Sequence, residues 1–179
     1  MNKPGHIAGS VALGVLLSAY VAPSFAHDNS LSDLADQIRA ELAGDPVTVK
    51  QPSRHPVTIT SSADAMFASG GWDLNPGMPV LRRLVPIFSK LQHTEIVVGG
   101  YTDNAPIGAQ LQSAGITTNL ELSCRRAGSV VGYLVAQGVN ANLLSIQCFG
   151  ATHAVAPNDT PEGQAKNRRV DITLSGDGT

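Results

Sequence analysis

The chain has 179 residues, of which 12 are lysine or arginine and 14 are aspartate or glutamate, so its formal net charge is −2 at pH 7. This slightly acidic balance argues against nucleic-acid binding, which usually requires a basic face. The length suits one domain of ordinary size preceded by a short segment.

The first 26 residues have the three parts of a secretory signal. Lys3 is the only charged residue before Asp28, residues 7–21 are almost entirely apolar, and Ser24 and Ala26 are small residues ahead of a cleavage point after Ala26. An uncleaved membrane anchor is the alternative reading. A membrane span needs about 20 apolar residues, and this run is shorter, so we predict cleavage and a periplasmic location.

Residues 27–56 form a lead-in to the main domain. Between Ser30 and Leu42, apolar residues recur at helical spacing, which predicts a short amphipathic helix that docks on the domain or on an envelope protein partner. Residues 46–56 contain three prolines and alternating valines, a pattern typical of an edge strand or a linker.

From Val57 to about residue 175, predicted strands and helices alternate. The strands are expected at 57–67, 95–101, 143–149 and 170–174, and the helices at 75–91, at 119–137 and briefly after Thr160. Pro86 should kink or split the first of these helices. The order predicts an α/β (α+β) sandwich, a mixed sheet with helices packed on one face.

The helix near residue 119 carries the clearest local signals. Thr118 and Glu121 have the spacing of a capping box, and Gly138 is placed to end the helix. Arg126 lies on the otherwise apolar line of this helix, whereas Arg125 is rotated away and has Glu121 as an i, i+4 partner. A guanidinium at such a position should pair with a carboxylate from the protein or from a ligand. A structural ion pair or a snorkelling arginine is the plainer explanation of this position.

Three further polar positions are candidates, each with a plainer structural explanation. Asp103 directly follows a buried strand, where open α/β sheets tend to bind ligands, but it could also form an Asx turn. Asn119 could bind a ligand or simply begin its helix. Thr160, with Asn158 and Asp159 before it, could belong to a binding loop or cap the helix that starts at Pro161.

Cys124 and Cys148 could form a disulfide in an oxidising compartment or remain two small buried thiols. The five histidines are scattered without metal-ligand spacing, so we predict no metal site. The common sequence signatures of hydrolases and nucleotide-binding enzymes do not occur, and we expect neither catalysis nor a cofactor.

Several motifs resemble the OmpA-like C-terminal, peptidoglycan-binding domain family, in the family's order and over about residues 57–174, with details closest to its MotB-type members. They are Ala65-Met66-Phe67-x-Ser69-Gly70, Gly100-Tyr101-Thr102-Asp103-Asn104-x-Pro106-Ile107, Asn119-Leu120-Glu121-Leu122-Ser123-x-x-Arg126-Ala127 and Asn158-Asp159-Thr160-Pro161-Glu162-Gly163-x-Ala165-x-Asn167-Arg168-Arg169-Val170.

This resemblance implies a βαβαβ-type sheet that binds the diaminopimelate of the peptidoglycan stem peptide. Asp103 would receive the ligand's ammonium group, and Arg126 would hold its carboxylate with a bidentate fork. Asn119, Thr160 and Arg169 would line or brace the same pocket. The implied role is a non-covalent cell-wall anchor in the periplasm of a Gram-negative envelope, with or without outer-membrane association.

Two other functions fit the same sequence. The chain could be a signal-anchored component of a motor or secretion assembly that meets its partner through the segment from Ser30 to Leu42. It could also be a periplasmic enzyme that acts on wall peptides, which would release muropeptide fragments from sacculi.

Overall fold

The computed structural model describes Met1 and residues 30–52, 56–75 and 79–179. The predicted signal peptide, residues 1–26, therefore lies almost wholly outside the described residues. Within those ranges no helix combines the length and the apolar character that a membrane crossing requires.

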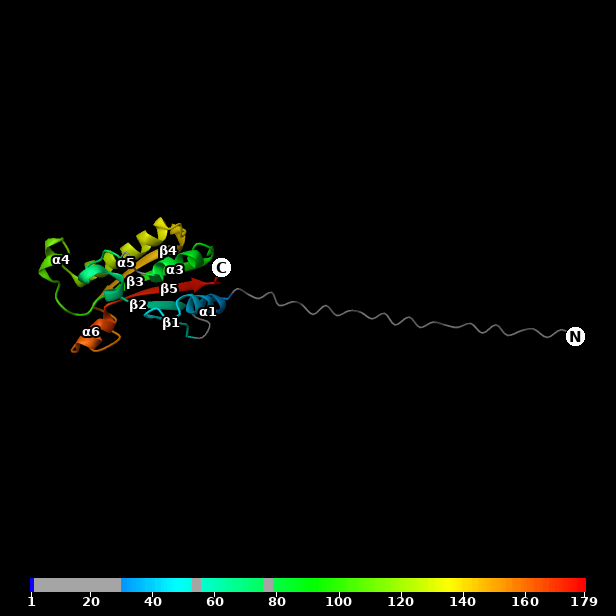
Figure 1. The fold of residues 1–179 in the computed structure, drawn as a ribbon, viewed down its shortest axis with the longest axis horizontal. Coiled ribbons are helices and arrows are strands. Elements are labelled where there is room, and N and C mark those ends of the chain that lie inside the picture. Colours follow the sequence, from blue (N-terminus) through cyan, green and yellow to red (C-terminus); the bar gives the residue numbers. More distant parts are fainter. Residues whose placement is uncertain (2–29, 53–55, 76–78) are drawn as a thin grey trace.

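A five-stranded mixed sheet organises the fold (Figure 1). The strands are β1 (Val47–Lys50), β2 (Val57–Ser62), β3 (Thr94–Tyr101), β4 (Leu144–Gly150) and β5 (Arg169–Gly176). Their order across the sheet is β1-β2-β5-β3-β4, with β3 and β4 parallel and the other neighbours antiparallel. The predicted mixed sheet is confirmed, and the proline-rich stretch after the lead-in helix contributes its edge strand β1.

Six α-helices connect or cover the strands: α1 (Leu31–Glu41), α2 (Ala63–Met66), α3 (Pro79–Phe88), α4 (Ala109–Ser113), α5 (Asn119–Ala136) and α6 (Pro161–Asn167) in the described part of the chain. Short 3-10 turns lie at Ala68–Gly70 and Ala141–Leu143. The main core lies between one face of the sheet and helices α1, α3 and α5. Alternate residues of β5, Val170, Ile172 and Leu174, are buried in this core, as the period of a strand requires.

The lead-in helix is part of this core. Leu31, Leu34, Ile38 and Leu42 are all buried, so the predicted amphipathic helix is confirmed and docks on the domain. Since its apolar side chains already pack inside the protein, they are not available to an envelope partner.

Several details differ from the sequence prediction: helix α3 ends at Phe88 and not at residue 91, and helix α4 was not predicted. The strand expected to reach Phe67 ends at Ser62, because the Ser62 side chain accepts a hydrogen bond from the Asp64 amide and begins α2. Helix α3 is not split at Pro86 but continues through it to Phe88. Pro86 has no N–H to donate to the Arg82 carbonyl one turn earlier. Because Pro86 is exposed, water can hydrogen-bond to that carbonyl instead.

Helix α5 is fixed at both ends and along its length. The predicted capping box is present, and Gly138, with a φ of 92°, ends the helix in a left-handed conformation. Gly100 on β3 approaches α5 so closely that an added Cβ would lie 2.2 Å from the Ser123 carbonyl oxygen. Cys124 on α5 and Cys148 on β4 form a disulfide, which settles the alternative that the sequence left open.

Candidate functional site

Asp103 lies in the loop that leaves β3 and is only 8% exposed. Its Oδ1 accepts a hydrogen bond of 3.1 Å from the Ala105 amide, the Asx turn that was the plainer explanation. Its Oδ2 accepts a hydrogen bond of 2.7 Å from Nη1 of Arg168. The local turn and the arginine together fix the direction of this carboxylate.

Arg126 lies on the buried face of α5 and is 2% exposed. Its Nε donates to the Gly71 carbonyl at 2.9 Å and its Nη2 to the Gly70 carbonyl at 2.6 Å. The guanidinium carbon lies 5.5 Å from the centre of the Phe67 ring. Nη1 is buried and has no hydrogen-bond partner among the described residues. Such a group is costly to leave unpaired, so this nitrogen is a candidate contact for a ligand.

No carboxylate of the described chain forms an ion pair with Arg126, so the structural ion pair considered from the sequence is absent. Burial lowers the pKa of Arg126, while the charges of Asp64 and Asp103 oppose this effect. These two carboxylates therefore act on Arg126 through space without contacting it.

Arg168 was missed as a site residue, and it connects the cluster. Its guanidinium donates to Asp103 on one side and, at 2.7 and 2.9 Å, to Asp64 on the other. Hydrogen bonds to Asp64 and Asp103 raise the pKa of Arg168. The adjacent Arg168 and Arg169 of the last motif were the available signal, but sequence alone could not say which faces the loop.

Arg169 lies on the other face of the sheet from the core. Its guanidinium carbon lies 3.6 Å from the centre of the Tyr101 ring, and its Nε donates to Asp171 at 3.1 Å. Burial, assisted by the Asp171 charge, raises the pKa of Tyr101. In the part of the chain that the structure describes, Arg169 forms no hydrogen bond with Asp103 or Arg126, so its place at their site stays a prediction.

The two remaining predicted residues have bracing roles in this structure. Asn119 donates from Nδ2 to the Ala105 carbonyl at 3.0 Å and so ties the Asp103 loop to the start of α5. Thr160 caps α6 by accepting a hydrogen bond of 3.1 Å from the Gly163 amide. Helix α6 leads directly into Arg168, which gives Thr160 an indirect part in placing that arginine.

The predicted ion pair between Arg125 and Glu121 is absent. Glu121 Oε2 instead accepts hydrogen bonds from the amides of Thr117 at 2.7 Å and Thr118 at 2.9 Å. These bonds lower the pKa of Glu121, with the Thr117 amide contributing most. Backbone capping therefore outcompetes the exposed side-chain pair.

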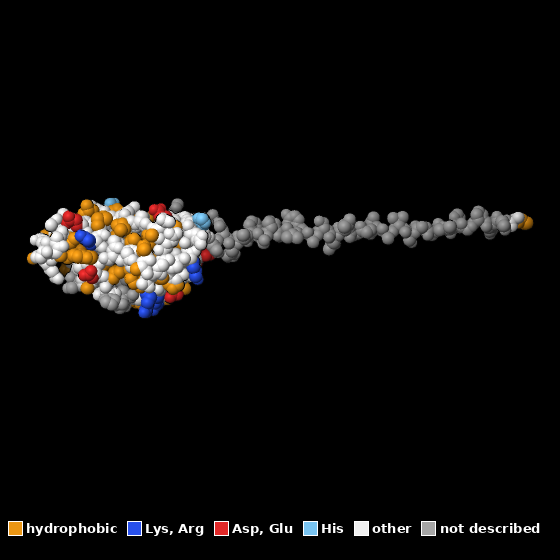
Figure 2. Space-filling view, turned by 90° about the horizontal axis from the view of Figure 1, so that it is seen from above, with side chains coloured by type: hydrophobic (Ala, Val, Ile, Leu, Met, Phe, Trp, Pro, Cys, Tyr) orange, Lys and Arg blue, Asp and Glu red, His pale blue; other side chains and the backbone are white. Residues whose placement is uncertain are grey.

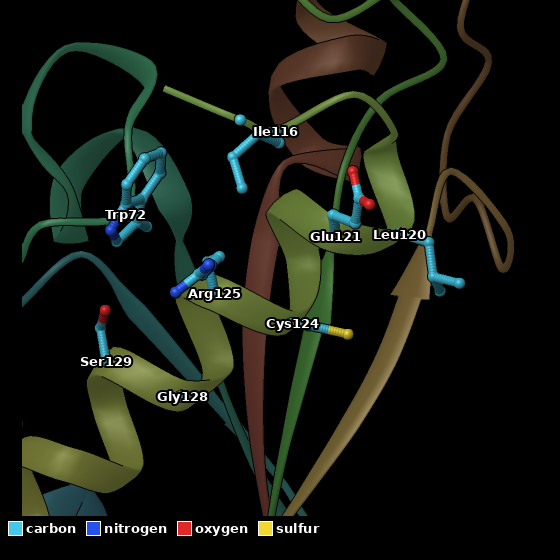
Figure 3. Close-up of a pocket in the computed structure, with 9 residues that line it drawn as sticks. Trp72, Ile116, Leu120, Glu121, Cys124, Arg125, Gly128 and Ser129 are labelled. Carbon is cyan, nitrogen blue, oxygen red and sulfur yellow. The ribbon is translucent and has the colours of Figure 1, made fainter. Parts of the chain in front are cut away.

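A cavity of about 530 Å³ lies beside α5, and neither Asp103 nor Arg126 lines it. Trp72, Ile116, Leu120 and Arg125 are among its lining residues (Figure 3). We call it the Trp72–Arg125 cavity. No sequence pattern predicted this cavity, because its walls come from three separate segments.

The described residues contain no group of three histidine, cysteine, aspartate or glutamate side chains that could hold a metal ion. On the face seen in Figure 2, basic side chains are few and separated and form no patch there that would attract a polyanion.

The family model described as the OmpA family matches residues 66–168. The chain is 36% identical over 120 residues to the peptidoglycan-binding protein ArfA of Mycobacterium tuberculosis strain H37Rv, covering 66% of this chain and 34% of ArfA. It is 38% identical over 101 residues to motility protein B of Helicobacter pylori strain J99, covering 56% of this chain and 38% of that protein. The chain thus spans little more than a third of the length of these two curated relatives.

Among solved structures, the chain is similar to the cell wall anchor of the T6SS from Pseudomonas aeruginosa. The TM-score is 0.69 and the sequence identity 29%, and the match covers 78% of this chain and 96% of the anchor.

Proposed function

This chain belongs to the OmpA family, and we propose that it binds peptidoglycan without covalent attachment and without catalysis. We further propose that its ligand is the diaminopimelate of the stem peptide, held between Asp103 and Arg126. The observation that carries this proposal is the buried Nη1 of Arg126, a cationic donor for which the described chain supplies no acceptor.

The charges around Arg126 fit a zwitterion. Asp64 and Asp103 carry two negative charges, and Arg126 and Arg168 carry two positive charges, so the cluster is balanced before a ligand arrives. The free end of diaminopimelate in a stem peptide carries one ammonium and one carboxylate group. Because this zwitterionic end has no net charge, the cluster stays electrically neutral when the end is buried, and no charge is left unpaired.

Each ligand group has an available partner. Arg126 has five N–H donors, two of which hold Gly71 and Gly70, so Nη1 can donate to the ligand carboxylate in a direction fixed by those bonds. Asp103 accepts one bond from Ala105 and one from Arg168, and a carboxylate has about four acceptor positions. It can therefore accept a further bond from the ligand ammonium group.

The proposed role is a cell-wall anchor in the periplasm, reached through the secretory signal at residues 1–26. A second candidate is a wall-binding component of a larger envelope assembly. The likeness to the cell wall anchor of the T6SS and to motility protein B supports this second role. Mass analysis of the mature protein separates the two, since an assembly component anchored by its signal would retain residues 1–26.

Co-sedimentation with diaminopimelate-containing sacculi tests the proposal. The purified chain should sediment with the wall, whereas Asp103→Ala and Arg126→Ala should remain in solution. Truncating one partner of a buried charged contact costs on the order of 2–5 kcal/mol, which is more than tenfold in affinity.

Arg82→Ala is the matched control, because Arg82 is exposed on α3 and takes part in none of the ion pairs of the described residues. Thermal unfolding of each variant separates lost binding from lost folding. A wild-type chain that stays in solution would refute the proposal, and release of muropeptide fragments would favour the wall-peptide enzyme instead.

A further inference from the structure

The Trp72–Arg125 cavity has the size of a small-molecule site. Its volume of about 530 Å³ is within the range of roughly 300–1,000 Å³ that is usual for such sites. Trp72, Ile116 and Leu120 supply apolar wall, and Arg125 supplies a positive charge. Such a lining suits a ligand with both a hydrocarbon part and a negative group.

Arg125 is the cation that this cavity presents. It is exposed, and none of the ion pairs found among the described residues involves it. The acid that also lines the cavity, Glu121, is engaged by the amides of Thr117 and Thr118. In Figure 3, Arg125 lies between Trp72 and Ser129, whereas the Glu121 carboxylate points away from Trp72. The Trp72 end of the cavity is therefore its positive end.

The cavity adjoins the proposed diaminopimelate site through shared structure. Arg126 holds the carbonyls of Gly70 and Gly71, and Trp72 is the next residue. Arg125 and Arg126 are consecutive on α5, so their side chains leave the helix about 100° apart and serve neighbouring surfaces. Ile107, Ile116 and Leu122 form a small second core that packs against Trp72 and joins the Asp103 loop to the cavity wall.

We propose that the Trp72–Arg125 cavity binds the acidic residue that precedes diaminopimelate in the stem peptide. This inference rests on the proposed function. A D-glutamate joined to diaminopimelate through its γ-carboxyl group keeps a free α-carboxylate, which would pair with Arg125. Its methylene groups would lie against Trp72, and the cavity would thereby distinguish acidic stems from stems amidated at this carboxylate.

Three soluble probes test the inference: meso-diaminopimelate, γ-D-glutamyl-meso-diaminopimelate, and the same dipeptide amidated at the glutamate α-carboxylate. Titration calorimetry gives each affinity, and fluorescence reports on the cavity because Trp72 is the only tryptophan in the chain. The wild type should bind the acidic dipeptide about fivefold more tightly than the amide, because an exposed ion pair with Arg125 contributes about this much to affinity. The acidic dipeptide should also change Trp72 fluorescence.

In Arg125→Gln the affinities for the two dipeptides should differ by no more than a factor of about two, because the exposed ion pair that favours the acidic dipeptide is lost. The affinity of this variant for meso-diaminopimelate should equal that of wild type, and Arg82→Gln should behave as wild type throughout. If Arg125→Gln keeps the wild-type preference, or if wild type has none, the inference is overturned while the proposed function stands. If wild type binds none of the three probes, the proposed function fails and the inference fails with it.

Discussion

Arg168 donates a hydrogen bond of 2.7 Å to Asp103 across 65 positions of sequence. Arg168 lies between α6 and β5, and this bond ties it to the loop after β3. Its guanidinium also donates to Asp64 at the start of α2. Three segments that are far apart in the chain are thereby fixed around Arg126. Arg168 thus holds together the segments that form the candidate site.

Replacing Arg168 should destabilise the fold through the Asp103 carboxylate. Arg168→Gln leaves this largely buried carboxylate without its charged donor, and the loss of a hydrogen bond between charged groups costs about 1.5–3 kcal/mol. Asp64→Asn removes only the more exposed pair and should cost less than about 1 kcal/mol. Urea unfolding of both variants measures the difference, and equal losses would contradict the central role of Asp103.

Two glycine-to-alanine substitutions should change the stability of the fold in opposite directions. Gly100→Ala places a Cβ against the α5 backbone, which cannot yield cheaply, and should cost about 1–3 kcal/mol or more. Gly132→Ala, in the exposed middle of α5 with open space around it, should stabilise the protein by roughly 0.5–1 kcal/mol. Thermal melts provide the comparison. A harmless Gly100→Ala would mean that β3 and α5 are not packed this closely.

The disulfide between Cys124 and Cys148 should contribute substantially to stability. It closes a loop with a sequence separation of 24 residues, for which loop entropy gives about 3 kcal/mol. Reduction with dithiothreitol should lower the free energy of unfolding by about this amount. The double variant Cys124→Ala/Cys148→Ala should already be less stable and should not respond to the reductant. A wild-type protein that is equally stable in both redox states would contradict the prediction.

The capping box of α5 predicts a specific pH dependence. Hydrogen bonds hold the pKa of Glu121 below its ordinary value, so its stabilisation is complete above the unfolded pKa of about 4.3. That contribution is lost as the pH falls through the lower folded pKa. The melting temperature of Glu121→Ala should therefore lie below that of wild type at pH 7, with a gap that narrows below about pH 4. A gap that stays constant from pH 7 to pH 3 would exclude this account.

The sequence predicted the architecture well because the strong signals were local. Alternating apolar residues marked β5, and the capping box at Thr118 marked the start of α5, both of which the structure confirms. Helices α2 and α4 were missed, because four and five residues are too few to show a helical period. The continuation of α3 through Pro86 depends on the exposure of that proline, which a local pattern does not show.

The site was only partly predictable, since side-chain direction at the ends of elements depends on tertiary contacts. Asp103 and Arg126 stood out by position, and the structure places both near Asp64 and Arg168. Arg168 follows a helix end, where no period indicates which way a side chain points. Arg169 was grouped with the site from its motif; the structure places its guanidinium over the Tyr101 ring, and its part in ligand binding stays a prediction.

The most direct test of the central claim compares two tripeptides that differ in one carboxylate. L-alanyl-γ-D-glutamyl-meso-diaminopimelate carries an ammonium and a carboxylate group at its free side-chain end, and the otherwise matching lysine tripeptide carries only the ammonium group. Titration calorimetry should show the diaminopimelate tripeptide binding more than about tenfold more tightly, with the difference absent in Arg126→Ala. Equal binding of the two tripeptides by the wild-type chain would contradict the claim that Arg126 holds the ligand's carboxylate.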